Sequence, residues 1–464
     1  MRVTSGMLGA ALAGVALTAL AQTEPQTERA VGGAEAKPSV KSEPVAPSVH
    51  PLFQDNAVIQ RSAATRIFGT AAPGAEVVVR LGTASATASA DESGRWSAAL
   101  NTEELKSNPY MLSVRSGEEE RKYGNVLVGQ VFLASGQSNM EMPLYGWGRN
   151  SPVLHAEEGT EALLELPEIR FLTVRPKREE APSGNLPERW IQPDSSTAPD
   201  LSAVASFFAT DLALALEEPI GIVHASLGGT RVEEWTSSEA LKKAGAAAGD
   251  SKNSTLFNGM IAPLKGLTFA GVIWYQGESN ADRAPERYAA LFSAMIADWR
   301  AFFGKPDLPF LFVQLAGFGP VEEDPNANPP FAVVREAQRQ TSLSVPNVWM
   351  AAIPDLGESK DIHPREKREV GRRLSLIAQK RLFGKDAKDA EGPRAVSARR
   401  EGDAVVVSFA DGALLSKPVP EKYVAGTGME DIPYRRKCGG ELETFALRDG
   451  NGVWHWASAS IVGN

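Results

Sequence analysis

The chain has 464 residues but a single cysteine, Cys438, so it can form no disulfide within itself. It contains no H-E-x-x-H, C-x-x-C, G-x-x-x-x-G-K-[ST] or G-x-G-x-x-G motif, so neither a metal nor a nucleotide cofactor is expected. The formal net charge is −9 and both signs are scattered, which offers no basic surface for nucleic acid. Stability must come from core burial, for which the chain is long enough.

The most informative segment runs from Val131 to Leu144 and reads V-F-L-A-S-G-Q-S-N-M-E-M-P-L. An apolar run stops at Gly136 and places Ser138 at the expected start of a helix. Unpaired N–H groups in a first helical turn, together with the helix dipole, stabilise negative charge, so Ser138 is a candidate nucleophile. The alternative is that Ser138 serves only as an N-cap.

Two later segments supply polar or small residues after expected buried strands. The first contains a Gly-Gly pair that lets backbone approach a ligand, and its Gly229 N–H is a candidate oxyanion donor. The second, G-V-I-W-Y-Q-G-E-S-N, places Gln276 and Asn280 at the carboxyl end of a strand, where open α/β sheets bind ligands. A tight turn and a capping asparagine are the structural alternatives.

Histidine is also scarce, which limits the candidates for a general base to five. His363 is the best of them, because it lies at a loop-to-helix junction in D-I-H-P with Asp361 two residues before it. A base needs hydrogen-bond reach of the nucleophile and a third group that fixes its tautomer. The other four, expected in packing, polar or terminal positions, are His50, His155, His224 and His455.

In this order, the segments G-Q-S-N-M, G-G-T, W-Y-Q-G-E-S-N and D-I-H-P resemble the sialate O-acetylesterase family, a branch of the SGNH (GDSL-like) hydrolases. N-G-M-I-A-P-L, D-L-P-F-L-F-V-Q-L-A, V-R-E-A-Q and E-V-G-R-R-L extend the resemblance over most of residues 52–383. It implies Ser138 as nucleophile and His363 as base. The oxyanion hole would comprise the N–H groups of Ser138 and Gly229 and a side chain of the third segment, Gln276 in preference to Asn280.

The chain departs from the wider SGNH pattern in two places. The residue three positions before His363, often an acid in SGNH enzymes, is Lys360, and the third segment lacks the usual G-x-N-D spelling. Asp361, Glu278 or a backbone carbonyl therefore remain alternatives for the group that orients the imidazole. The site is expected to be a Ser-His dyad with a loose third member.

The resemblance implies an enzyme that removes acetyl groups from O-acetylated sugars through a serine acyl-enzyme, without metal or cofactor. The acidic chain would repel an anionic substrate such as sialic acid, and Arg231 and Arg335 are candidate contacts that offset this charge, although either can be structural. The alternatives are an acetylxylan or broader short-chain esterase or lipase on the same fold, and a non-catalytic glycan-binding protein.

Strands that alternate with helical patterns predict an α/β fold, and the resemblance implies a flavodoxin-like, three-layer SGNH hydrolase domain with flanking β-sandwich-like regions.

The start of the chain is typical of a signal peptide, so we expect export to the periplasm or the extracellular space and no membrane span in the mature chain. The sequence leaves the oligomeric state open. The expected parts are a signal peptide (1–21), a disordered linker (22–48), an N-terminal β-sandwich-like domain (49–125), the hydrolase domain (126–385), and a C-terminal β region (386–464) that ends before the further strands of similar proteins.

Overall fold

The computed structural model describes residues 46–147, 153–246, 249–320, 322–387, 390–392, 394–410 and 445–460. Residues 44–464 form one compact unit, and this unit is described below. The described residues do not include residues 1–45 or Cys438. The signal peptide and the linker therefore stay predictions. Within the described ranges, no helix combines the length and apolar character that crossing a bilayer requires.

Two antiparallel sheets come first in the unit. Exposed and buried side chains alternate along their strands, as in β4 and β6, because successive side chains point to opposite faces of a sheet. The buried faces share one core, in which Val77 and Val79 of one sheet join Trp96 and Ala98 of the other. The strands are β1 (Ser48–Val49), β3 (Thr65–Thr70) and β6 (Arg95–Leu100) in the first sheet, and β4 (Glu76–Leu81), β5 (Ala84–Ser89) and β7 (Tyr110–Ser116) in the second.

The strand β8 (Glu119–Gly136) joins these β elements to the rest of the unit. Its first part pairs antiparallel with β7, and its later part lies in a parallel sheet between β10 and β11. From Val126 onward every residue of β8 is buried, which explains the continuous apolar run in the sequence. The same strand that closes the N-terminal sheet therefore leads directly to Ser138.

The parallel part of the sheet has the strand order β9-β10-β8-β11-β12-β13. Helices connect its strands, since parallel neighbours need long crossovers. The α/β class predicted from the sequence is confirmed. The remaining strands are β2 (Val58–Gln60), which pairs with β8, and β9 (Ile169–Thr173), β10 (Ile220–Ser226), β11 (Gly271–Tyr275), β12 (Phe310–Val313) and β13 (Val348–Ala351).

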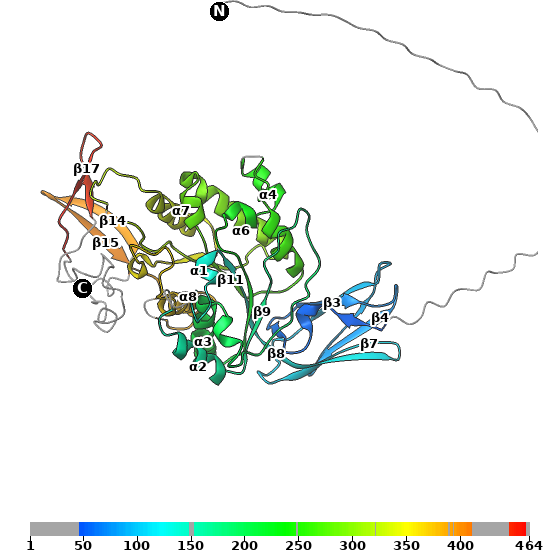
Figure 1. Ribbon diagram of the computed structural model, residues 1–464. Coiled ribbons are helices and arrows are strands. Elements are labelled where there is room, and N and C mark those ends of the chain that lie inside the picture. The colour runs from blue at the N-terminus through cyan, green and yellow to red at the C-terminus, as the bar shows by residue number, and fades with distance from the viewer. Residues whose placement is uncertain are drawn as a thin grey trace, which may run out of the picture. The chain divides into compact units, whose positions relative to one another are not determined.

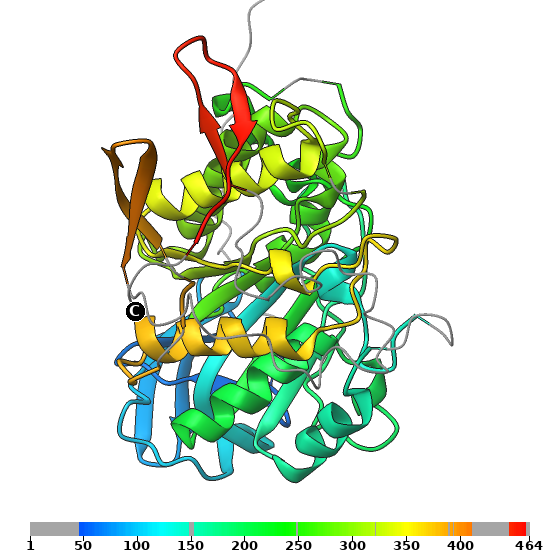
Figure 2. The same ribbon diagram turned by 90° about the vertical axis from the view of Figure 1, so that its left-hand side faces the viewer.

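Helices cover both faces of the parallel sheet (Figures 1 and 2). On one face Phe208 of α3 and Leu374 of α8 share a core with Phe132 of β8, and on the other Phe292 of α6 shares a core with Trp274 of β11. The described unit thus has three layers here. The α-helices are α1 (Ser138–Glu141), α2 (Ala156–Glu165), α3 (Ala203–Leu216), α4 (Ser238–Lys243), α5 (Glu278–Ala281), α6 (Tyr288–Phe303), α7 (Pro330–Ser344) and α8 (Arg368–Arg381).

Short helical turns and two β-hairpins complete the described elements. The hairpins occur in the region where the sequence predicts C-terminal β structure, and residues 411–444 between them lie outside the described part. The hairpins are β14 (Arg394–Glu401) with β15 (Ala404–Ala410), and β16 (Ala446–Arg448) with β17 (Trp454–Trp456). The turns are η1 (Pro51–Phe53), η2 (Ala198–Asp200), η3 (Val232–Trp235), η4 (Phe257–Ile261), η5 (Ala262–Leu264), η6 (Pro285–Arg287) and η7 (Pro354–Leu356).

Candidate active site

A sharp turn at the end of β8 presents Ser138. Gly136 has φ +139°, and a Cβ added there would lie 2.1 Å from the carbonyl oxygen of Tyr275 in β11, so only glycine fits. Ser138 is the first residue of α1, and Gln137 occupies the N-cap position. The N-cap alternative for Ser138 is therefore not what the structure shows, and the Ser138 N–H belongs to the first turn of α1, where no intrahelical acceptor exists.

His363 faces Ser138 from the segment between β13 and α8. The Nε2 atom of His363 lies 3.0 Å from the Ser138 Oγ, within hydrogen-bond distance, although 225 residues separate the two in sequence. The Ser138 residue is only 7% exposed. Burial and the nearby Lys367 ammonium lower the pKa of His363, while Asp361 opposes the shift. The neutral imidazole, the form that can accept a proton, is thereby favoured.

Asp361 is the acid beside this imidazole, but its contact is long. Its Oδ1 lies 3.6 Å from the His363 Nδ1 and accepts a hydrogen bond of 2.8 Å from the backbone N–H of His363. Glu278, the other acid considered, instead accepts a hydrogen bond of 2.5 Å from Asn139. Asp361 therefore fits the loose third member expected from the sequence.

Replacing Asp361 by asparagine should lower kcat by about 10²-fold, less than the roughly 10⁴-fold typical of a tight triad. The reason is that the carboxylate favours the Nδ1–H tautomer through a long contact, whereas asparagine can still accept the His363 backbone N–H. Steady-state kinetics of the purified variant measure the effect. An unchanged kcat would contradict a role for Asp361 in orienting His363.

The Gly-Gly turn after β10 lies directly against Ser138. A Cβ added at Gly228 would be 3.2 Å from the Ser138 Cβ, and the Gly228 N–H donates a 2.6 Å hydrogen bond to Glu141 Oε2. Burial raises the pKa of Glu141, and this hydrogen bond opposes the shift. Gly229 has φ +70°, and a Cβ added there would meet nothing within 4 Å. Glu141 thus ties the turn to α1, with Gly229 on its open side.

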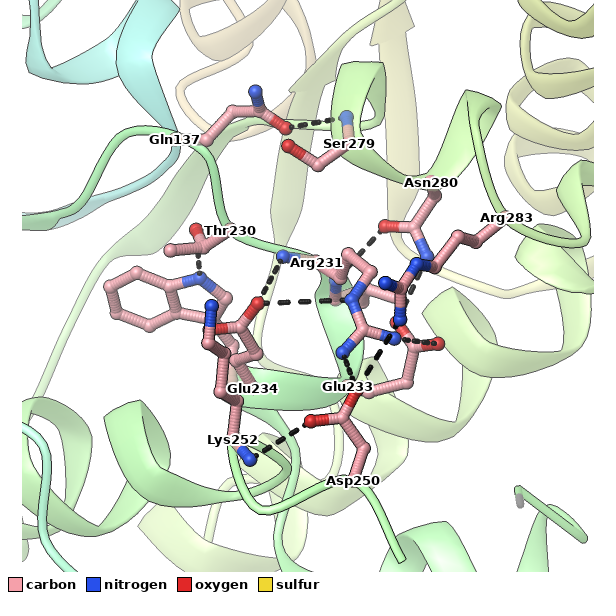
Figure 3. Close-up of polar contacts among 12 residues, drawn as sticks. Gln137, Thr230, Arg231, Glu233, Glu234, Asp250, Lys252, Ser279, Asn280 and Arg283 are labelled. Atoms are coloured by element: carbon pink, nitrogen blue, oxygen red, sulfur yellow. Dashed lines mark hydrogen bonds and ion pairs between the residues drawn. The ribbon is translucent and has the colours of Figure 1, made fainter.

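The amides of Gln276 and Asn280 contact a neighbouring loop in this structure, so the oxyanion-donor role suggested by the sequence stays a prediction. The Gln276 Nε2 donates to the Thr230 carbonyl (3.1 Å) and to the Asn280 Oδ1 (2.7 Å), so both of its hydrogens are used. Asn280 in turn accepts from the Val232 N–H (3.0 Å) and donates to Glu233 (2.9 Å; Figure 3). These side chains hold the loop that follows β10 against α5.

Arg231 belongs to the same cluster (Figure 3). Its guanidinium forms ion pairs with Glu233 at 3.7 Å, with Glu234 at 3.9 Å and with Asp250. Three carboxylates offset its charge, which favours the structural alternative over a substrate contact. Arg335 in α7 donates a 3.3 Å hydrogen bond to the carbonyl of Ala316.

The sequence did not point to four residues that surround the Ser–His pair. The Trp147 ring lies edge-on to His363, with centroids 4.7 Å apart, and is 41% exposed, so it can form a wall for a bound substrate. Asn139, Glu141 and Lys367 make polar contacts beneath or beside the pair. All four lie within nine residues of Ser138 or His363, but spacing along the chain does not reveal which neighbours turn inward.

The described residues contain no group of three or more His, Cys, Asp or Glu side chains that could hold a metal ion. The described site brings together the Ser138 hydroxyl, the His363 imidazole and backbone N–H groups of a first helical turn. A serine hydroxyl against an imidazole, beside first-turn N–H groups, is the arrangement of hydrolases with a serine nucleophile.

Comparison with known proteins identifies the family. A family model described as carbohydrate esterase, sialic acid-specific acetylesterase, matches residues 128–379, more than half of the chain, and the chain belongs to this family. Sialate O-acetylesterases of Homo sapiens and Pongo abelii are each 32% identical to it over 300 residues. The alignments cover 58% of this chain and 56% of each relative, so the chain spans little more than half their length.

A solved structure extends the likeness to most of the fold. A carbohydrate acetylesterase from Xanthomonas citri superimposes with a TM-score of 0.75 at 32% sequence identity. The superposition covers 90% of this chain and 89% of that chain. The likeness therefore includes the N-terminal sheets as well as the parallel sheet.

Proposed function

We propose that this protein is a carbohydrate O-acetylesterase that cleaves acetyl esters of sugars through an acetyl-serine intermediate. The observation that carries the proposal is the 3.0 Å contact between Ser138 Oγ and His363 Nε2 in a chain of the sialic acid-specific acetylesterase family. The similarity to a carbohydrate acetylesterase from Xanthomonas citri supports the broader substrate class, acetylated carbohydrate. We further propose that the three-layer part of the chain is an SGNH-type hydrolase domain.

The first half of the reaction forms the acyl-enzyme. His363 Nε2 takes the Ser138 proton while Oγ attacks the acetyl carbonyl carbon, and the N–H groups of Ser138 and Gly229 stabilise the negative oxygen. The bond from carbonyl carbon to sugar oxygen then breaks as the imidazolium protonates that oxygen. The sugar leaves with a free hydroxyl, and the acetyl group remains on Ser138.

The second half returns the free enzyme. Water loses a proton to His363 Nε2 and attacks the acetyl-serine carbonyl, and the same donors hold the oxyanion. Acetic acid leaves as the imidazolium returns the proton to Ser138 Oγ, and it loses its remaining proton to solvent to become acetate. Asp361 lies 3.6 Å from the His363 Nδ1. It favours the Nδ1–H tautomer, which leaves Nε2 free to accept a proton in both halves of the reaction, and it stabilises the imidazolium.

Acetate release from O-acetylated sialic acid and from acetylated xylan tests the proposal, with an octanoyl ester as the comparison. We expect a kcat/KM for the better acetylated sugar that exceeds the octanoyl value by about 100-fold or more, because each surplus methylene that a site cannot accommodate costs about 1–3 kcal/mol of transition-state binding.

The other outcomes decide between the alternatives. Preference for the octanoyl ester would contradict the carbohydrate esterase and favour a lipase on the same fold. Binding of either sugar polymer with no acetate release would instead indicate a glycan-binding protein. Preference between sialic acid and xylan would identify the sugar class.

A further inference from the structure

A buried asparagine links the two residues proposed to carry the reaction. Asn139 follows Ser138 in α1 and is 1% exposed. Its Nδ2 donates a 3.0 Å hydrogen bond to the carbonyl of Ile362, the residue before His363. One side chain therefore fastens the backbone next to the nucleophile to the backbone next to the base.

Two buried charges determine which way this amide points. The Nζ of Lys367 donates to the Asn139 Oδ1 at 2.5 Å, and the Glu278 Oε1 accepts from Nδ2 at 2.5 Å. A flipped amide would place its NH₂ against the ammonium and its oxygen against the carboxylate, so the flip would lose both hydrogen bonds. It would also turn the oxygen toward the Ile362 carbonyl.

Both charges are kept out of water, which makes their influence on the amide strong. Lys367 is 0% exposed and Glu278 is 4% exposed, and the second carboxylate oxygen of Glu278 has no hydrogen-bond partner among the described residues. Two opposite buried charges of this kind cost desolvation and contribute little to stability by themselves. Their shared partner, Asn139, directly follows the proposed nucleophile, and Lys367 lies four residues after the proposed base, which points to a role in the site.

We propose that Lys367 and Glu278 are positioning residues that act through Asn139 to hold the Ile362 carbonyl, and with it His363, in line with Ser138. The proposal rests on the proposed function, since it assigns these residues to the same reaction. It replaces the sequence-based alternative in which Glu278 contacts the imidazole directly. The carboxylate instead acts on His363 through Asn139 and the Ile362 carbonyl.

The charge of Lys367 has a second consequence for His363. Burial lowers the pKa of Lys367 to about 7, and the charges of Glu278, Glu358, Asp361 and Glu366 around it oppose the shift. The protonated ammonium in turn lowers the pKa of His363. The acid limb of the rate profile belongs to His363, which must be neutral to accept the Ser138 proton, so removing the ammonium should move that limb to higher pH.

We call the link from Lys367 and Glu278 through Asn139 to the Ile362 carbonyl the relay. Three variants test it in the full chain: Asn139→Asp, Lys367→Met and the charge-free double variant Glu278→Gln with Lys367→Met. Asn139→Asp keeps the shape but removes the donor to Ile362. The matched control is Lys305→Met, because Lys305 is also a partly buried lysine with a lowered pKa, and its Nζ binds the Phe269 carbonyl instead. Circular dichroism and thermal melting identify any variant that fails to fold.

Two readouts are needed, one with an acetylated sugar and one without. The first is kcat and KM for acetate release, and the second is the rate at which phenylmethylsulfonyl fluoride modifies Ser138, each followed against pH. We expect Asn139→Asp and Lys367→Met to lower kcat and the sulfonylation rate by about 10–100-fold with little change in KM, as for small misplacements of reacting groups. Lys367→Met should also shift the acid limbs of both pH profiles to higher pH. Lys305→Met should change neither the two rates nor the acid limbs.

The double variant keeps the proposal open to contradiction if a single variant unfolds. It removes both charges together, so no lone charge is left buried. Folded variants that match the wild type in kcat, sulfonylation rate and acid limb would overturn the relay and leave the esterase proposal intact. A wild type that releases no acetate, yet is sulfonylated faster than the variants, would overturn the esterase proposal alone. A wild type that neither releases acetate nor is sulfonylated would overturn both.

Discussion

Replacing Ser138 by alanine should lower kcat for acetate release by roughly 10⁴–10⁶-fold, the range seen when a serine nucleophile is removed. The variant retains the Ser138 and Gly229 backbone N–H groups, but no oxygen remains to form the acyl-enzyme. The Ser138 hydroxyl contacts His363 through one hydrogen bond. We therefore expect the free energy of unfolding to change little, by about 1 kcal/mol or less.

A matched serine three residues earlier separates catalysis from folding. Ser135 lies in β8, is fully buried, and its Oγ has no hydrogen-bond partner among the described residues. Ser135→Ala removes the same atom without loss of a hydrogen bond, so activity and stability should both persist. If Ser138→Ala kept more than about a hundredth of the wild-type kcat, Ser138 would not be the nucleophile, because a missing nucleophile costs far more.

The position of Ser138 could be predicted because its signals are local. A continuous apolar run forms the buried half of β8, a glycine turns the chain, and the serine begins the helix, all within residues 126–138. His363 could be predicted for another reason, since five histidines leave few candidates and Asp361 lies beside it. The structure places both at the carboxyl edge of one parallel sheet, on different connections.

The roles of the polar residues after β11 could not be predicted in the same way. Gln276 and Asn280 are at the expected strand end, but their amides are used by Thr230, Val232 and Glu233 of another loop. An amide can satisfy a neighbouring loop or a substrate with the same groups, so residue type does not decide between them. The pairing depends on how two strand connections meet, which is a tertiary property.

The relay through Asn139 was hidden for a similar reason. Its charges come from α5 and from the segment before α8, and neither contacts the imidazole in the described geometry. The sequence indicates an acid next to His363 and leaves Glu278 as an alternative for that direct contact. The structure gives the carboxylate a partner, Asn139, whose importance appears only when Ile362 is brought to it.

Gly136→Ala should lower the free energy of unfolding by more than about 4 kcal/mol, a loss found only where a substitution breaks a specific structural requirement. The added Cβ would lie 2.1 Å from the backbone oxygen of Tyr275 in the neighbouring strand, and φ +139° is unfavourable for alanine. The two central strands, β8 and β11, would have to separate at the edge that carries the site. Urea denaturation of the full chain measures the change.

Gly117→Ala distinguishes this close approach from the general cost of a positive φ. Gly117 has φ +59° and a Cβ added there meets nothing within 4 Å, so alanine should cost only about 1–2 kcal/mol. Equal losses in the two variants would mean that β8 and β11 can move apart freely at Gly136. A much larger loss for Gly136→Ala would show that the turn is fixed by contact with the neighbouring strand. The same contact that excludes a side chain at Gly136 would then place Ser138 two residues later, within reach of His363.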